Sequence, residues 1–441
     1  MLDAAQGCGR MNSHMEEMTA SVSRRFARGA LIVVLLVVAG HVVASTAGSA
    51  GQSSRAGDSA IRPFTINIPD AVLKDLKERL TRARFPDQLA GAGWTYGTDL
   101  AYLQQLVRYW RDKYDWREQE RRLNKLPQFK TNIDGLDIHF VHRRSPEPNA
   151  FPIIMIHGWP GTFFEFSKMV EPLADPRSHG GRPEDAFNVV VVSLPGYGFS
   201  ERPNRMGHSR ERTGRIFIEL IKRLGYTRYG VQAGDVGYAV ATLMALADPQ
   251  NMAGLHLNRC SGAPPNPTEP NAGLTPEEIR LKDEPRFGRD EGGYAIIQGT
   301  KPQTLGYALN DSPVGLAAWI VEKYRKWCDC NGDPENVFTK DELLTTVMIY
   351  WVTETATSAA RYYYEGQHIP EPPYAPIPGF VKVPTGCTVF PGELGFTPRS
   401  WAETRFNVKR FTMMPKGGHF AALEQPVLLT NELRAFFRDL R

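Results

Sequence analysis

The sequence passes directly from a short apolar strand into a buried helix, and one acidic residue, Asp235, stands at the junction. Residues 229–232 end an apolar run, while residues 238–247 have the Ala, Leu and Met content of a buried helix. Small residues stand two positions before and two positions after the acid, at Ala233 and Gly237. This spacing is typical of a strained strand-to-helix elbow that holds a nucleophile above the edge of a sheet, because larger side chains would clash with neighbouring backbone.

Short apolar segments that end in Gly or Pro turns recur along the chain, and helical patterns follow the later ones. Near-continuous Val and Ile runs that alternate with helices indicate a parallel sheet covered by helices on both faces. We therefore predict an α/β fold with a mostly parallel sheet. The expected strands lie within residues 136–144, 151–160, 187–196, 229–235, 253–262, 386–393 and 410–420.

Two helix-rich regions accompany this alternating pattern. Residues 62–130 carry helical stripes of apolar side chains and little sheet pattern, which predicts an N-terminal helical extension. Residues 262–366 are rich in Pro at first and then helical, which predicts an inserted helical cap. The cap would divide the α/β core into a first part, residues 131–261, and a second part, residues 367–441.

The N-terminus has the layout of a secretory signal peptide. Within residues 1–50, three arginines precede an apolar run from Ala30 to Ala44, and small residues follow. This run of about 15 residues is shorter than the roughly 20 that a spanning helix needs. We expect an exported protein, secreted or extracytoplasmic, with residues 51–61 as a flexible linker. The alternative is an uncleaved anchor at residues 30–44, which would associate the protein with a membrane.

Composition excludes some partners. The net charge of +4 is small and unclustered, so nucleic acid is not expected as a partner. Five cysteines are too few and too scattered to predict a disulfide framework or a zinc site. We interpret Cys328 and Cys330 as two free thiols. Oligomeric state stays open.

Four chemically capable residues follow predicted strands, where open α/β sheets keep their sites. Asp235 stands on the elbow, and His157 begins the turn "HGWPG", which includes Gly158 and Pro160. Glu393 and His419 follow the last two strands. Nucleophile, acid and histidine in this chain order match the α/β-hydrolase arrangement.

One alternative concerns the acid that orients the histidine. Glu269 follows the strand before Glu393 and could serve instead. We favour Glu393.

An aspartate at the elbow, where serine usually stands, restricts the reaction. A carboxylate attacks saturated carbon well and forms an alkyl ester, so it suits epoxide opening or halide displacement. Water must then hydrolyse the ester, with His419 as general base. The backbone N–H groups of Trp159 and Val236 are expected to stabilise the oxyanion that forms. This chemistry requires no cofactor and no metal.

Several longer motifs match one family. They include "HGWPG", "SLPGYGFSERP", "QAGDVG", "GYAIIQGTKPQTLGYALNDSPVGLAAWIVEK", "RYYYEG", "FPGELGFTPRSW" and "GGHFAALEQP". With these motifs, the chain from about Arg62 to its C-terminus resembles the microsomal-type epoxide hydrolases of the α/β-hydrolase fold. The resemblance covers about 380 residues.

The resemblance implies roles for particular residues. The family's nucleophile, acid and histidine fall on Asp235, Glu393 and His419. Two cap tyrosines that hold the epoxide oxygen and donate a proton match Tyr294 and Tyr363. A phenol suits this role because the departing alkoxide is strongly basic.

The tyrosine assignment and one substitution leave open points. The neighbours Tyr362 and Tyr364 leave the register around Tyr363 open by one residue. Many relatives have Trp after the nucleophile, whereas this chain has Val236, which keeps the N–H donor but removes an indole from the pocket floor.

The leading hypothesis is therefore an epoxide hydrolase that makes vicinal diols from a small apolar epoxide and water. A haloalkane dehalogenase is the nearest alternative, but such enzymes usually hold the halide with an indole N–H beside the nucleophile, which Val236 lacks. A third alternative is a non-catalytic binding protein with a hydrolase fold. Binding without turnover would support that interpretation.

Overall fold

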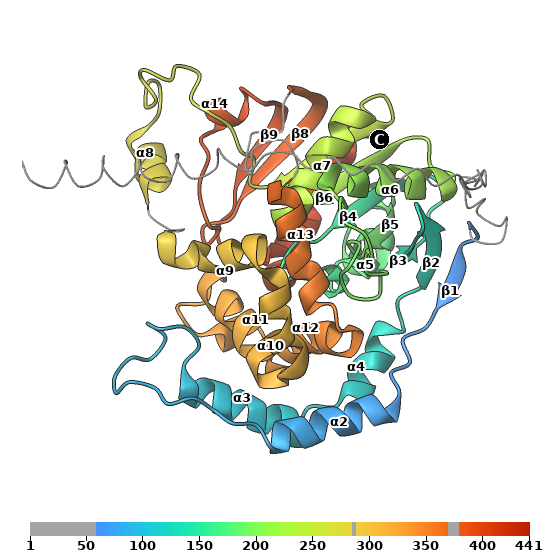
Figure 1. The fold of residues 1–441 in the computed structure, drawn as a ribbon. Helices are drawn as coiled ribbons and strands as arrows, with labels where there is room; N and C mark the ends of the chain where they lie inside the picture. Colours follow the sequence, from blue (N-terminus) through green and yellow to red (C-terminus); the bar gives the residue numbers. More distant parts are fainter. Residues whose placement is uncertain (1–58, 285–287, 369–378) are drawn as a thin grey trace, which may run out of the picture. The chain divides into compact units, whose positions relative to one another are not determined.

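The computed structural model describes residues 59–284, 288–368 and 379–441, and a nine-stranded sheet lies at its centre (Figure 1). The strand order is β1-β2-β3-β5-β4-β6-β7-β8-β9. The first three strands and β5 pair antiparallel to one another, and from β5 to β9 all neighbours are parallel. The strands are β1 (Arg62–Phe64), β2 (Gln128–Ile133), β3 (Leu136–Arg143), β4 (Phe151–Ile156), β5 (Phe187–Val192), β6 (Tyr229–Ala233), β7 (Met252–Asn258), β8 (Val381–Val389) and β9 (Phe406–Met413). The mostly parallel α/β fold is confirmed.

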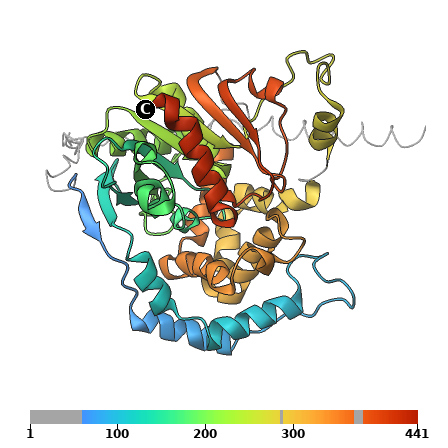
Figure 2. The ribbon, with the colours of Figure 1, turned by 180° about the vertical axis from the view of Figure 1, so that it is seen from behind.

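Helices cover both faces of the sheet, which explains its apolar central strands. Residues 153–156 of β4 and 189–192 of β5 are fully buried. The helices α6 and α7 pack together on one face, and α16 crosses the other (Figures 1 and 2). The core helices are α5 (Val170–Ala174), α6 (Arg210–Arg223), α7 (Asp235–Ala247), α14 (Arg399–Ala402), α15 (Ala421–Glu424) and α16 (Pro426–Phe437). Short 3₁₀ helices are η1 (Phe163–Phe166), η2 (Arg177–His179), η3 (Pro183–Asp185), η4 (Pro334–Asn336) and η5 (Arg438–Leu440).

The N-terminal region is helical, as expected, but it also supplies two strands. Its helices are α2 (Asp70–Thr81), α3 (Leu100–Asp112) and α4 (Trp116–Leu123), and they contact the cap helices α11 and α12. The strands β1 and β2 extend the sheet at its edge, and β2 crosses the boundary expected at residue 130. β2 forms by pairing with β3 across a tight Asp134-Gly135 turn, in which both residues have positive φ angles of 56° and 78°.

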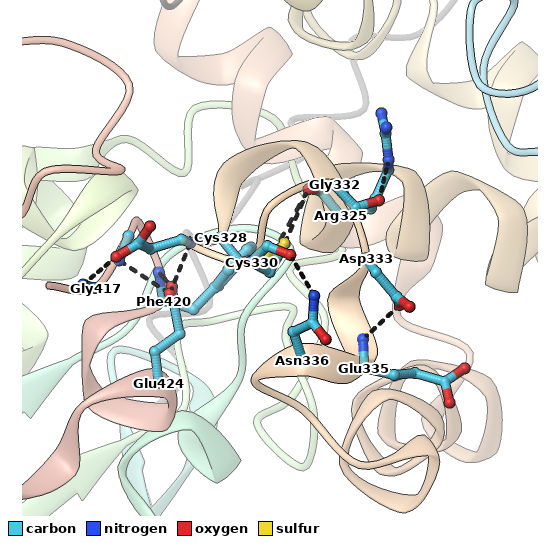
Figure 3. The surroundings of a disulfide bond; sticks show 12 residues. Arg325, Cys328, Cys330, Gly332, Asp333, Glu335, Asn336, Gly417, Phe420 and Glu424 are labelled. Atoms are coloured by element: carbon cyan, nitrogen blue, oxygen red, sulfur yellow. Dashed lines mark hydrogen bonds between the residues drawn. A yellow bond between two sulfur atoms is a disulfide. The ribbon is translucent and has the colours of Figure 1, made fainter.

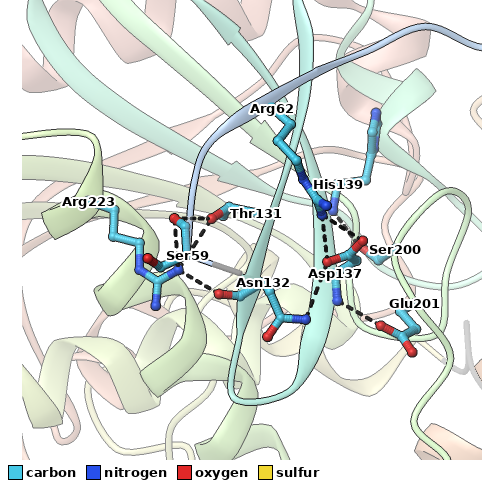
Figure 4. Close-up of polar contacts among 9 residues, drawn as sticks. All are labelled: Ser59, Arg62, Thr131, Asn132, Asp137, His139, Ser200, Glu201 and Arg223. Atoms are coloured by element: carbon cyan, nitrogen blue, oxygen red, sulfur yellow. Dashed lines mark hydrogen bonds and ion pairs between the residues drawn. The ribbon is translucent and has the colours of Figure 1, made fainter. Parts of the chain in front are cut away.

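Polar contacts attach β1 to the edge of the sheet (Figure 4). Arg62 forms a bidentate ion pair with Asp137, at 2.8 and 2.9 Å. The hydroxyl of Thr131 donates to the carbonyl of Ser59 at 3.0 Å, and the backbone N–H of Asp137 donates to Glu201 at 2.9 Å. Because the edge strand is covered and charged, it is protected from pairing with other chains.

A helical cap is inserted between β7 and β8. Its helices are α8 (Pro276–Asp283), α9 (Arg289–Thr300), α10 (Pro302–Asp311), α11 (Pro313–Trp327), α12 (Lys340–Thr353) and α13 (Ala356–His368). The pattern of residues 341–365 reads as one continuous helix, but the structure divides it at Glu354, whose φ of 54° is left-handed and ends α12. This break lets α13 pack against α9 and α10.

The expectation of free thiols at Cys328 and Cys330 is wrong. These residues form a disulfide, and Cys260 pairs with Cys387. The second pair is 127 residues apart in sequence, but β7 and β8 are neighbours in the sheet, so the two Cα atoms lie 5.6 Å apart. Spacing along the chain does not reveal this proximity because the cap is inserted between the two strands.

The predicted signal or anchor at residues 1–50 and most of the predicted linker lie outside the described ranges. Across residues 59–284, 288–368 and 379–441, no helix has the length and apolar character needed to cross a membrane.

Candidate active site

Asp235 is the first residue of α7, directly after β6, and the backbone there is strained. Its φ of 49° lies in the left-handed region, which is unfavourable for a residue with a side chain. A Cβ atom on Gly237 would lie 2.5 Å from the carbonyl oxygen of Ile156, so only glycine fits. A Cβ on Gly234 would make only ordinary contacts, the nearest at 3.5 Å to Asn258. The steric need for a small residue is therefore strict after the acid and weak immediately before it.

Backbone donors hold the Asp235 carboxylate. Its Oδ1 accepts a hydrogen bond of 2.8 Å from the N–H of Trp159, and the N–H of Val236 also contacts the carboxylate. Its Oδ2 lies 3.5 Å from Nε2 of His419. Burial alone would raise the pKa of Asp235, but His419 and the two N–H groups lower it below its ordinary value. Asp235 is thus an ionised carboxylate at neutral pH.

His419 lies between two carboxylates. Its Nδ1 is 2.8 Å from Oε1 of Glu393, and the N–H of Leu394 donates to the same oxygen. Burial raises the pKa of Glu393, but His419 outweighs this and lowers it to about 2. Burial lowers the pKa of His419, while Glu393 and Asp235 together raise it well above its ordinary value.

The alternative acid, Glu269, lies elsewhere. It is exposed in a surface turn, where it accepts a 3.4 Å hydrogen bond from Asn266. The structure therefore brings Glu393, and not Glu269, to His419.

The loop that carries His419 is attached to the cap. The N–H of His419 donates to the carbonyl of Trp327 at 2.9 Å, and the N–H of Gly417 donates to Asp329 at 2.8 Å. Glu424 accepts from the N–H of Asp329 at 3.0 Å (Figure 3). Asp329 lies between the two cysteines of the cap disulfide. Cap and core thus share a hydrogen-bond network directly behind the imidazole.

The "HGWPG" turn positions the N–H of Trp159. His157 is fully enclosed and bridges the turn, since its Nδ1 lies 2.9 Å from the carbonyl of Gly158 and its Nε2 accepts from the N–H of Leu194 at 3.2 Å. Burial lowers the pKa of His157 to about 4, so it is neutral and structural. The peptide bond between Trp159 and Pro160 is cis. A side chain at Gly158 would collide with Asp235, because a Cβ there would lie 2.3 Å from Oδ1.

Two cap tyrosines lie together opposite the core. Tyr294 on α9 and Tyr363 on α13 are buried, with ring centroids 5.8 Å apart. The indole of Trp159 stacks on Tyr294 at 4.7 Å and meets Tyr363 edge-on at 6.1 Å. Burial raises the pKa of Tyr363 well above its ordinary value, so the phenol keeps its proton and can donate it.

The structure distinguishes Tyr363 from its neighbours. The hydroxyl of Tyr362 donates to Thr213 at 3.1 Å, and Tyr364 stacks on His368 at 3.8 Å. Tyr363 is therefore the one of the three that contacts Tyr294 and Trp159.

Two further side chains were not predicted from the sequence. Lys323 is buried, with Nζ 5.2 Å from the centroid of Tyr294 and 2.7 Å from the carboxylate of Glu322. Glu165 lines the same cavity as Asp235 and His419. A single lysine in a helical stripe and a single glutamate among phenylalanines carry no motif, so no sequence signal marks either residue.

The polar groups meet in a cavity of about 10 Å³, which includes the side chains of Asp235, Glu393 and His419 in its wall. In the described part of the chain, no group of three or more His, Cys, Asp or Glu side chains is arranged to hold a metal ion.

Comparisons with known proteins agree with this geometry. Residues 61–166 match the family "Epoxide hydrolase N terminus", and residues 152–288 match the family "alpha/beta hydrolase fold". A putative epoxide hydrolase of Stigmatella aurantiaca (strain DW4/3-1) is 46% identical over 385 residues, which is 86% of each chain. Epoxide hydrolase 1 of Sus scrofa is 39% identical over 422 residues, with 88% of this chain and 91% of that protein covered.

Solved structures extend the likeness. The epoxide hydrolase of Aspergillus niger has a TM-score of 0.76 and 34% identity, covering 87% of this chain and 97% of that one. The juvenile hormone epoxide hydrolase of Bombyx mori has a TM-score of 0.74 and 31% identity, covering 87% and 95%. The chain therefore belongs to the epoxide hydrolase family and is an epoxide hydrolase with the α/β-hydrolase fold.

Proposed function

We propose that the enzyme opens an apolar epoxide through a covalent ester on Asp235. The Oδ2 atom attacks a ring carbon, the carbon–oxygen bond of the ring breaks, and the departing oxygen takes a proton from Tyr294 or Tyr363. Oδ1 stays with the N–H groups of Trp159 and Val236. The product of this half-reaction is an alkyl ester.

Water then hydrolyses the ester. His419 takes a proton from the water, whose oxygen bonds to Cγ of Asp235. The oxyanion that forms on Oδ1 is stabilised by the same two N–H donors. The bond between Cγ and Oδ2 breaks, and Oδ2 leaves in the diol. Glu393 keeps the imidazole oriented and stabilises its positive charge.

One observation carries this proposal. Two backbone donors hold one oxygen of Asp235, while the other oxygen faces His419. An acyl-transfer enzyme would aim such donors at a substrate carbonyl, whereas here they already hold the carboxylate that becomes the ester.

The two alternatives are less well supported. A halide would need an N–H donor beside the nucleophile, and the side chain of Val236 has none; phenols suit a departing oxygen better. A non-catalytic binding protein would have no need of the pairing between His419 and Glu393.

Aromatic rings enclose the reacting groups and favour an apolar substrate. Trp159, Tyr294 and Trp327 contact one another above Asp235, with centroid separations from 4.7 to 6.1 Å. Because the cavity measures only about 10 Å³, an epoxide is admitted only after cap side chains have moved.

A single turnover in ¹⁸O-water tests the ester. Excess enzyme reacts with a simple aryl epoxide, and both the diol and the digested peptides are analysed for label. We expect label in the Asp235 carboxylate and an unlabelled diol, with the Glu393 peptide of the same digest as internal control. Asp235→Ala should give no diol. Label in the diol alone would mean direct attack by water and would exclude the nucleophile; turnover of haloalkanes but not epoxides would favour the dehalogenase.

We also propose that the protein is exported. The supporting observations are the N-terminal layout and two disulfides, which persist in oxidising compartments. The mature mass of secreted protein would report cleavage near residues 47–50; an intact mass in a membrane fraction would favour the anchor.

A further inference from the structure

A third carboxyl group lies in the wall of the active-site cavity. Glu165 belongs to the 3₁₀ helix η1, whose residues Phe163 and Phe166 are buried in the core. Its side chain lines the cavity together with those of Asp235 and His419. Among the residues that the structure describes, no side chain or backbone group forms a hydrogen bond or ion pair with this carboxyl. A polar group in such a place is costly unless something in the cavity pairs with it.

The backbone makes room for this carboxyl at Gly161. A Cβ atom on Gly161 would lie 2.5 Å from Oε2 of Glu165, which no real contact allows. The carbonyl of Gly161 accepts a 3.0 Å hydrogen bond from the hydroxyl of Tyr350, so this backbone is fixed from the cap side. The glycine and the tyrosine therefore define where the carboxyl lies.

The cavity has the size of one water molecule. A volume of roughly 10–15 Å³ is the least that holds a water, and a buried water needs two to four polar partners. The cavity measures about 10 Å³ and is bounded by the carboxyl of Glu165, the imidazole of His419 and the carboxylate of Asp235. These three groups supply the partners.

Glu165 is neutral in this setting. Burial is the main cause that raises its pKa, to about 8, and the negative charge of Asp235 adds to the effect, while His419 opposes it. A protonated carboxyl adds no further negative charge beside Asp235 and Glu393. It can also accept one hydrogen bond and donate another to the same solvent molecule.

We propose that Glu165 is a positioning residue for ester hydrolysis, which holds the attacking water between His419 and Cγ of Asp235. The water gives one proton to Nε2 of His419 and its oxygen bonds to Cγ. Its second hydrogen is held by the carbonyl oxygen of Glu165, which neither gains nor loses a proton in the step. The inference rests on the proposed ester mechanism.

Separate measurement of the two half-reactions tests it. Ester formation is followed by stopped-flow quenching of tryptophan fluorescence, to which Trp159 contributes, and ester hydrolysis by mass spectrometry of the quenched enzyme. For Glu165→Leu we expect hydrolysis about 10- to 100-fold slower, since loss of positioning costs up to about 10²-fold, with ester formation changed less than about twofold. Ester should accumulate in the steady state. Glu165→Gln has nearly the same shape and keeps a neutral hydrogen-bonding group, so it should recover most of the hydrolysis rate.

A second variant guards against misfolding. Gly161→Ala adds a methyl group that displaces the Glu165 carboxyl, and it should slow hydrolysis selectively while Glu165 itself is retained. Equal slowing of both half-reactions, or no slowing in either Glu165→Leu or Gly161→Ala, would overturn the inference. These outcomes differ from failure of the ester mechanism, in which the wild-type enzyme itself forms no ester.

Discussion

The elbow at Asp235 allows a paired glycine test. Alanine at position 237 would place Cβ 2.5 Å from the carbonyl oxygen of Ile156 and 2.8 Å from that of His157. Both are backbone atoms, so the helix and the turn must separate by at least about 0.5 Å. Alanine at position 234 would meet Asn258 at 3.5 Å, an ordinary van der Waals contact. The two substitutions add the same methyl group three residues apart.

The steric cost can be weighed against the gain in helix propensity. Overpacking a rigid interior costs typically about 1–3 kcal/mol. Replacing glycine by alanine inside a helix returns about 1 kcal/mol. We therefore expect Gly237→Ala to lower the free energy of unfolding by about 1–2 kcal/mol. Gly234→Ala lies at the N-cap, where alanine is somewhat worse than glycine, and should cost less than about 1 kcal/mol.

Activity should separate the two variants more clearly than stability. The carbonyls of Ile156 and His157 lead into the turn that supplies the N–H of Trp159 to the nucleophile. Because a displacement near 1 Å can cost about 10²-fold, we expect ester formation in Gly237→Ala to fall about 10- to 100-fold. Stopped-flow fluorescence and urea unfolding would measure both quantities. Wild-type stability and rate in Gly237→Ala would refute the steric account of the elbow.

Three further predictions concern the acid, the base and a disulfide. Tyr294→Phe and Tyr363→Phe should each slow ester formation by about 10²-fold, with little effect on ester hydrolysis, because each removes a proton donor to the departing oxygen; equal loss in both half-reactions would contradict this. Ester hydrolysis should rise with pH and then level off, because only neutral His419 accepts a proton and Glu393 raises its pKa; single-turnover rates that fall between about pH 6 and 9 would contradict the assignment of the base. Replacing both Cys260 and Cys387 by alanine should lower the free energy of unfolding by about 3–5 kcal/mol, since the bridge closes a loop of 127 residues; an unchanged urea midpoint would exclude the bridge.

Local steric rules made the elbow and the strands predictable from sequence. Val and Ile runs such as residues 189–192 form strands wherever both faces are buried, so the parallel sheet was expected correctly. Asp235 and Gly237 belong to a turn whose constraints act within five residues. The chain order of Glu393 and His419 then follows from the order of parallel strands.

Other features depend on contacts between distant segments, and sequence periodicity does not report them. β2 is too polar to resemble a strand, although its Asp134-Gly135 turn is a hairpin signal that could have revealed it. Pairing of Cys260 with Cys387 needed the strand order, which places β7 beside β8. Glu165 and Gly161 could be linked only through coordinates, since the clash between them is a matter of tenths of an ångström.

The attachment of the histidine loop to the cap has a consequence for protein engineering. The carbonyl of Trp327 and both polar groups of Asp329 belong to the inserted segment, yet they hold the backbone of Gly417 and His419. The insert is therefore not an exchangeable module. A chimera that transplants a relative's cap should retain residues 327–330 of this chain, because a graft without them would acquire a new substrate range together with a misplaced base.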